Sequence, residues 1–146
     1  DDFDGDGLAV VEAYFANVAK VAEKKPTILG HFDLIKKING DGKFFDEQDP
    51  RYKAAADAAL MVAARNRCVL EVNTSAGYRG FRKDFFPSDE ILKDWLALSG
   101  NVVITADAHD TKALTFGYEE AAAKLKALGY SKVQVLGKDG FQACSL

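Results

Sequence analysis

The sequence predicts an α/β protein in which parallel strands are joined by crossover helices. Helix and strand signals alternate along all 146 residues, and the expected strands begin roughly thirty to forty residues apart, the period of a βα unit. Polar side chains suited to chemistry follow several of these strands, as they do at the active edge of parallel α/β folds. Short crossovers favour a barrel-type layer, but four strands cannot close a (β/α) barrel, which needs about eight. We therefore expect either an open α/β sheet or half of a barrel.

Each element rests on its own local signals. In chain order, we expect helices over residues 8–24, 50–66, 89–98 and 118–128, and strands over residues 27–29, 68–73, 102–105 and 132–136. Apolar residues at helical spacing define the first helix, and Pro26 ends it before the first strand. Asp49 as N-cap and Pro50 at the first helical position start the second helix. Ser88 caps the third helix, and Gly129 closes the fourth.

Composition limits the class of protein. The hydrophobic share of 48% is enough for the core of one domain, here residues 1–146. The net charge of −3 and the dispersed Lys and Arg residues argue against a nucleic-acid surface. No apolar run approaches the ~20 residues of a membrane span, and no signal-peptide pattern opens the chain. We expect a cytoplasmic protein, with Cys68 and Cys144 as buried, reduced thiols.

The most informative stretch is the end of the third strand, where an apolar, β-branched run stops at Asp107 and His109. Side chains two positions apart in extended backbone point to the same side, so this carboxylate and imidazole can converge on one point. Zinc, manganese and iron bind such donors. His31 also follows an apolar run and is a third candidate ligand. The alternative is that Asp107 caps the next segment and that both histidines are structural or solvated.

Two more groups of polar residues accompany the second strand. Glu71 and Asn73 project to one side of it, and a carboxylate in this position needs a partner because burying a charge is costly. We expect Glu71 either to orient an imidazole or to pair with an arginine, and Asn73 to contact the substrate. Arg79 and Arg82 follow in the next loop, and their forked donors suit the oxygens of a phosphate. The alternative is that both arginines are simply exposed.

The opening Asp-x-Asp-x-Asp-Gly pattern of residues 2–7 resembles the start of a calcium-binding loop. Such a loop needs a bidentate Glu at its last position, which Ala13 occupies here, while Glu12 lies one residue away. We interpret the pattern as a polar turn.

Taken together, these stretches resemble the carboxyl-terminal part of histidinol-phosphate phosphatases of the polymerase and histidinol phosphatase (PHP) superfamily. The resemblance is carried by residues 12–15 (Glu-Ala-Tyr-Phe), 28–35 (Ile-Leu-Gly-His-Phe-Asp-Leu-Ile), 70–77 (Leu-Glu-Val-Asn-Thr-Ser-Ala-Gly), 86–88 (Phe-Pro-Ser), 106–109 (Ala-Asp-Ala-His) and 116–117 (Phe-Gly). It spans nearly the whole chain. The Gly-His-x-Asp, Glu-x-Asn-Thr and Asp-Ala-His elements are specific in combination, in this order and spacing.

The resemblance implies a distorted (β/α)7 barrel with two or three divalent metals, zinc, manganese or iron, at the carboxyl ends of its strands. In that family the residues matching His31, Asp107 and His109 are metal ligands, so Asp107 and His109 are the expected catalytic residues. Metal-bound hydroxide attacks the phosphorus of L-histidinol phosphate, a small phosphorylated substrate, and the leaving alkoxide is protonated. Basic side chains hold the phosphate, and Arg79 is the candidate for this role here.

The chain departs from the family in one important way. The family's amino-terminal His-x-His pair and its further His and Glu ligands have no counterpart here, and three candidate ligands are too few for a multinuclear site. Ala106 stands where the family usually has Ser. The chain also begins without Met. We therefore expect the carboxyl-terminal half of a single PHP domain, without its amino-terminal half, and an isolated chain that is inactive or nearly so.

Two other functions stay open. The first is a PHP-type phosphoesterase that acts on another phosphoester such as a nucleotide, although the chain has no basic aromatic track for a nucleic acid. The second is a non-catalytic α/β binding module. Neither the metal nor the oligomeric state follows from the sequence. The open edge of a half-barrel would suit either a homo-oligomer or the missing half as partner.

Overall fold

The computed structural model describes residues 3–80 and 84–146 of the chain. In chain order the elements are α1 (Gly7–Ala22), β1 (Ile28–Leu29), the 3₁₀ helices η1 (Leu34–Ile38) and η2 (Gly40–Gly42), α2 (Pro50–Arg65), β2 (Val69–Asn73), α3 (Ser75–Tyr78), α4 (Asp89–Ala97), β3 (Asn101–Thr105), the 3₁₀ helix η3 (Thr111–Ala113), α5 (Tyr118–Ala127), β4 (Lys132–Gly137) and β5 (Gly140–Ser145). Every expected helix and strand is present, with ends within one or two residues of the prediction.

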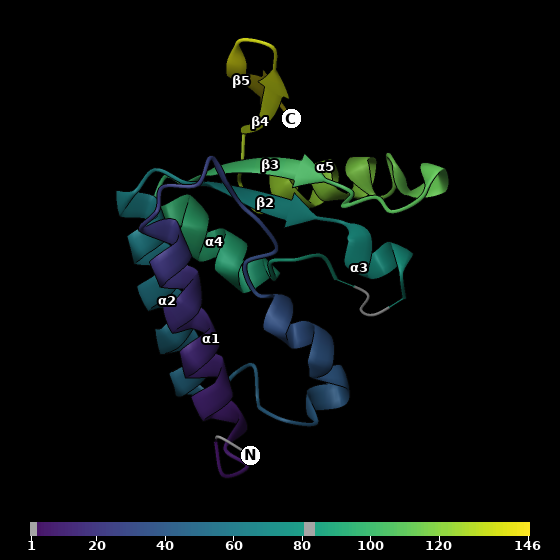
Figure 1. The fold of residues 1–146 in the computed structure, drawn as a ribbon. Helices are drawn as coiled ribbons and strands as arrows, with labels where there is room; N and C mark the ends of the chain where they lie inside the picture. The colour runs from purple at the N-terminus through teal and green to yellow at the C-terminus, as the bar shows by residue number, and fades with distance from the viewer. Residues whose placement is uncertain (1–2, 81–83) are drawn as a thin grey trace.

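The strands form one open, five-stranded sheet in the order β1-β2-β3-β4-β5 (Figure 1). Strands β1 to β4 are parallel to their neighbours, and β5 is antiparallel to β4. In the register of the first three strands, Leu29 pairs with Leu70, which in turn pairs with Val102. The predicted parallel α/β sheet is therefore confirmed, and this sheet does not close on itself.

Helices α1 and α2 begin where a side-chain cap satisfies their first backbone amides, whereas Ser88 precedes α4 without a capping side-chain hydrogen bond. In α1, the Asp6 carboxylate accepts hydrogen bonds from the amides of Leu8 and Ala9 at 2.9 and 3.2 Å. In α2, the Asp49 carboxylate accepts from the Arg51 amide at 2.7 Å. The first backbone amides of a helix have no hydrogen-bond acceptor within the helix, and these carboxylates supply one. The end of the opening acidic pattern thus serves as a helix cap, in agreement with its interpretation as a polar turn.

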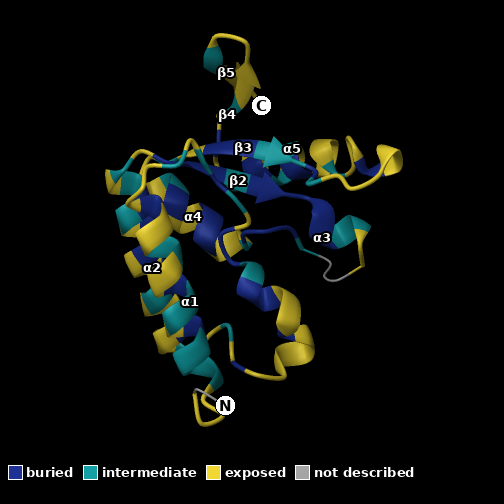
Figure 2. Cartoon of the chain, viewed as in Figure 1, coloured by how far each residue is buried: buried dark blue, intermediate teal, exposed yellow. Residues whose placement is uncertain are grey.

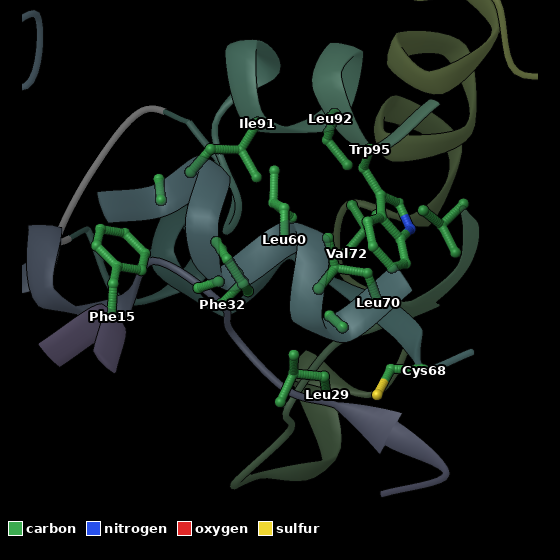
Figure 3. Packing of buried hydrophobic residues seen from close by; sticks show 14 of the residues in the cluster. Phe15, Leu29, Phe32, Leu60, Cys68, Leu70, Val72, Ile91, Leu92 and Trp95 are labelled. Atoms are coloured by element: carbon green, nitrogen blue, oxygen red, sulfur yellow. The ribbon is translucent and has the colours of Figure 1, made fainter. Parts of the chain in front are cut away.

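One face of the sheet carries the hydrophobic core. Side chains from α1, α2, α4 and α5 pack there against β1, β2 and β3, and the buried residues concentrate between these elements (Figures 2 and 3). Members of this cluster include Phe15, Leu29, Phe32, Leu60, Leu70, Val72, Leu92, Trp95, Val102 and Leu125.

The other face of the sheet has a different character because side chains alternate along a strand. In β2, Leu70 and Val72 join the core cluster, whereas Val69, Glu71 and Asn73 point to the opposite side. The polar residues of the second strand therefore lie on the face that the core helices do not cover.

Besides the three short 3₁₀ helices η1, η2 and η3, which the sequence did not predict, the structure differs from the prediction in three places. A single helical turn, α3, interrupts the expected loop over residues 74–87. The unpredicted strand β5 forms a hairpin with β4 that extends away from the rest of the molecule (Figure 1). Cys144 lies on this hairpin and is exposed, so its prediction as a buried thiol is wrong, whereas Cys68 is buried as expected. A projecting hairpin leaves both of its faces in solvent, so it lacks the clean alternation by which strands are recognised.

Gly100 lies against the ring of Trp95, which is fully buried. A Cβ atom at Gly100 would overlap that ring, and the tight packing leaves it no space to move into. We expect Gly100→Ala to lower the free energy of unfolding by about 1–3 kcal/mol in urea denaturation.

Gly40→Ala is the matched control, because no other part of the described chain lies within 4 Å of its Cβ position. It should change the free energy of unfolding by no more than about 0.5 kcal/mol. Equal stabilities of the two variants would contradict the packing of Trp95 on Gly100.

Candidate functional site

The carboxyl ends of β1, β2 and β3 lie next to one another because these strands are parallel neighbours. His31 follows β1, Asn73 ends β2, and Asp107 and His109 follow β3. Neighbouring strands lie about 4.8 Å apart, so roughly 10 Å separate the ends of β1 and β3. The structure thus places all of these residues at one edge of the sheet.

His31 is held in a turn that both α1 and β2 contact. Its backbone has a positive φ of 26°, and its side chain is exposed. The His31 amide donates to Glu71 Oε2 at 2.6 Å. From α1, the Tyr14 hydroxyl donates to the Phe32 carbonyl and accepts from the Leu34 amide, both at 3.1 Å. Burial raises the pKa of Tyr14 to about 12, so this hydroxyl keeps its proton and can donate.

Asp33 completes the Gly-His-x-Asp element and is fully buried. Its Oδ2 atom accepts from Lys36 Nζ at 2.8 Å and from the Ser88 amide at 3.0 Å. Ser88 is the residue before α4, so this carboxylate ties the turn after β1 to the start of that helix. Asp33 therefore has no surface open to solvent, and its Oδ2 contacts support the position of the turn.

Glu71 is the acceptor that joins the three strand ends. Besides the His31 amide, it accepts from Thr105 Oγ1 at 2.6 Å on Oε1 and from Asn73 Nδ2 at 3.2 Å on Oε2. Among residues 3–80 and 84–146, Glu71 contacts neither an imidazole nor an arginine, and its predicted pairing with Arg82 falls outside this range. Its partners are a backbone amide, a hydroxyl and a side-chain amide, because the positive φ of His31 turns the amide, and not the ring, toward β2.

Asn73 is almost completely buried, with an exposed fraction of 1%. Its Nδ2 donates to Glu71, and its Oδ1 accepts from the Ser75 amide at 2.9 Å. Its backbone amide and carbonyl pair with Phe86 at 2.7 and 3.1 Å. Both ends of the side chain are therefore used within the protein, and a direct contact of Asn73 with a substrate stays a prediction.

Asp107 and His109 lie close together, but the predicted extended backbone between them is wrong, because Asp107 has a positive φ of 45°. His109 Nδ1 is 2.7 Å from the Asp107 carbonyl and 3.8 Å from Asp107 Oδ1. Ser75 donates its hydroxyl to Asp107 Oδ2 at 3.4 Å. The two side chains are 36% and 66% exposed, so both can be reached from solvent.

Arg79 places a guanidinium against this pair. Its Nη2 atom lies 3.2 Å from the Asp107 carbonyl, 3.7 Å from Asp107 Oδ2 and 3.3 Å from His109 Nε2. The same Nη2 atom also lies against His109 Nδ1, so a guanidinium donor and the Asp107 carbonyl acceptor both face this ring nitrogen. The second predicted phosphate ligand, Arg82, lies outside the described residues.

Tyr78 and Asp110 form a contact that the sequence analysis missed. The Tyr78 hydroxyl lies 2.9 Å from both carboxylate oxygens of Asp110, and the carboxylate also accepts from the amides of Lys112 and Ala113 at 2.8 and 3.1 Å. The Tyr78 hydrogen bond is the largest of the effects that lower the pKa of Asp110. An Asp immediately before a helical turn is a recognisable cap, but its partner Tyr78 could not be read from the sequence.

The described residues do not gather into a complete set of metal ligands. Within residues 3–80 and 84–146, no three His, Cys, Asp or Glu side chains gather closely enough to hold a metal ion. Asp107 and His109 offer two adjacent donors, and His31 lies beyond β2. The positive charge of Arg79 lies against that pair. An anion would compete for Arg79, and a divalent cation would compete for Asp107 and His109.

No protein-family model matches the chain, and no curated protein matches it. Among the described residues, none of the helices combines the length and the apolar character that crossing a bilayer requires. The geometry of the sheet edge is therefore the basis for assigning a function.

We expect Tyr78→Phe to raise the pKa of the Asp110 carboxyl toward its ordinary value, since the main hydrogen bond to the charged form is removed. Carboxyl-detected NMR titration over the acidic range measures this shift. A lowered pKa in the folded state adds stability above the ordinary pKa, and that stability is lost as the pH falls through the folded value. The variant should therefore lose less stability than the wild type on acidification.

Tyr118→Phe is the control, because this exposed hydroxyl has no hydrogen-bond partner among residues 3–80 and 84–146. It should leave the Asp110 titration unchanged. An unaltered Asp110 titration in Tyr78→Phe would contradict the assigned hydrogen bond.

Proposed function

We propose that this chain is the carboxyl-terminal half of a cytoplasmic PHP-type phosphatase that uses divalent metals to hydrolyse L-histidinol phosphate to L-histidinol and phosphate in histidine biosynthesis. The observation that supports this most is the shared edge of β1, β2 and β3, which carries His31, Arg79, Asp107 and His109. The carboxyl edge of parallel strands is where α/β enzymes bind their substrates. The order and spacing of these residues resemble those of the PHP family.

The open sheet supports the half-barrel part of the proposal. The core helices cover one face, whereas Val69 and Glu71 of β2 and Val103 and Thr105 of β3 point to the other face. In a (β/α) barrel that second face lines the interior. We propose that the other half of the domain covers it. The antiparallel strand β5 departs from the all-parallel pattern of such barrels.

His31, Asp107 and His109 are the residues that would hold the metals. Their imidazole and carboxylate donors suit zinc, manganese and iron alike. The adjacent donors of Asp107 and His109 fit such an ion in part, but two are fewer than the ligands of a complete site, so the rest would come from the other half of the domain. When bound, the metals would supply an activated water and neutralise charge on the phosphate.

Arg79 would bind the phosphate of the substrate. A planar guanidinium donates in parallel to two oxygens, which matches a phosphate group. Arg79 reaches both Asp107 and His109, so a phosphate held by Arg79 would lie next to that pair. The His109 ring lies against the same guanidinium, so its imidazole could take or return a proton there.

We expect the isolated chain to release no measurable phosphate from L-histidinol phosphate with manganese or zinc added, because its described donors do not complete a metal site. The complete protein, which carries the amino-terminal half, should bind two or three equivalents of transition metal and turn over this substrate. Phosphate release and metal analysis measure the two properties.

Rapid turnover by the isolated chain would contradict the proposal that it carries only part of the metal site. A complete protein without transition metal would favour a non-catalytic binding module. Faster hydrolysis of a nucleoside monophosphate than of L-histidinol phosphate would instead favour a phosphoesterase with a different substrate.

In the complete enzyme, Asp107→Ala or His109→Ala should abolish turnover and reduce the metal content. Arg79→Ala should mainly raise KM, by about tenfold to a hundredfold, because a charge-assisted contact to phosphate is lost. Arg65→Ala removes the same charge at the opposite edge of the sheet, where α2 ends before β2, and should leave KM unchanged. An unchanged KM in Arg79→Ala would exclude Arg79 from the phosphate site.

A further inference from the structure

We infer that Glu71 is a positioning residue that holds the turn carrying His31 in a defined place relative to the Asp107–His109 pair. Glu71 lies on β2, the strand between β1 and β3. Its carboxylate contacts His31, which follows β1, and Thr105, which ends β3 just before Asp107. The importance of this spacing for catalysis rests on the proposed function, whereas the positioning itself rests on the contacts of Glu71.

The first contact compensates an unfavourable backbone conformation. A positive φ is costly for a residue with a side chain, and His31 adopts one at 26°. In this conformation its amide lies 2.6 Å from Glu71 Oε2, a short distance typical of a hydrogen bond to a charged acceptor. The neighbouring Gly30 allows this approach, because a Cβ atom there would lie 3.3 Å from the same oxygen. Glu71 thus stabilises the turn from which the His31 ring emerges.

The second contact reaches the opposite neighbour of β2. Thr105 donates its hydroxyl to Glu71 Oε1 at 2.6 Å, and Thr105 ends β3 only two residues before Asp107. One oxygen of the Glu71 carboxylate therefore accepts from the turn after β1, and the other accepts from the end of β3. A shift of either segment along the sheet would lengthen one of the two short hydrogen bonds.

A third, indirect connection leads to the Asp107 side chain. Asn73 donates to Glu71 Oε2 at 3.2 Å and accepts from the Ser75 amide at 2.9 Å, and Ser75 donates its hydroxyl to Asp107 at 3.4 Å. In the described part of the chain, the partners of Glu71 donate to both of its oxygens. A glutamine carries no charge and keeps only one acceptor oxygen, so its other end could meet Thr105 only by donating to the hydroxyl.

These contacts lie outside the hydrophobic core. Glu71 points away from the face that Leu70 and Val72 fill, so its replacement leaves the core packing of β2 in place. The effect of a substitution should therefore be found at His31 and Asp107 and not throughout the fold.

The test is Glu71→Gln in this chain, followed by backbone NMR and amide hydrogen exchange. We expect the His31 amide to exchange about tenfold faster, since its hydrogen bond changes from a charged acceptor to a neutral one. The amide signals of His31 and Asp107 should both shift. Glu23→Gln, an exposed residue at the opposite edge of the sheet, should change neither. An unchanged His31 exchange rate, or a shift confined to β2, would overturn the inference.

A second pair of variants removes only one donor and keeps the carboxylate, should Glu71→Gln fail to fold. Thr105→Val lacks the hydroxyl and should shift the Asp107 amide, whereas Thr105→Ser keeps the hydroxyl and should restore the wild-type signal. Equal spectra of Thr105→Val and the wild type at Asp107 would overturn the inference.

Titration with Zn²⁺ alone separates this inference from the proposed function. In the wild-type chain, the NMR signals of the His31 and His109 rings should shift over the same range of Zn²⁺ concentration. In Glu71→Gln, the Zn²⁺ concentration at which the His31 shift is half complete should rise about tenfold. A wild-type chain whose rings do not respond would count against the proposed metal site, while the exchange rate of the His31 amide would still decide the positioning role. A response at His31 that is equally strong in Glu71→Gln would overturn that role.

Discussion

The geometry of the sheet edge depends on one carboxylate. A charged side chain on a strand is costly unless hydrogen bonds replace the water it loses, and Glu71 meets this need with donors from three places. Two of these donors, the His31 amide and the Thr105 hydroxyl, belong to the segments on either side of β2. Satisfying the charge of Glu71 therefore also fixes where those segments lie. The same contact offsets the unfavourable φ of His31.

The segment after β2 organises the loop after β3 in a similar way. Ser75 and Arg79 both contact Asp107, and Tyr78 donates to the carboxylate that caps η3. These three residues belong to one helical turn and its cap, so a short, locally folded unit supplies all of the contacts. The arrangement balances charge as well, since the guanidinium neutralises Asp107 where the side chains are open to solvent. An anion could then replace Asp107 as the partner of Arg79, and a cation could replace Arg79 as the partner of Asp107. Neither ligand would have to bind beside an unpaired charge.

Most of the secondary structure could be predicted because its signals are local. Asp49 and Pro50 predict the start of α2 since capping joins residues two or three positions apart, and the structure has that contact. The strand β5 escaped prediction because its hairpin projects into solvent, so no buried face imposes an alternating pattern on its sequence. The exposure of Cys144 follows from the same cause. The single turn α3 is too short to produce a helical period.

The sequence by itself determined which polar residues stand at the ends of the strands and that Asp107 lies near His109, because only one residue separates them. Their contact does not come from extended backbone, since Asp107 has a positive φ of 45°. Only the tertiary structure decided that Glu71 accepts from the His31 amide and from Thr105, partners 40 and 34 residues away in the chain. It also decided that Arg79 turns toward Asp107. Such contacts depend on how the whole sheet aligns distant segments, and no local pattern of residues specifies that alignment.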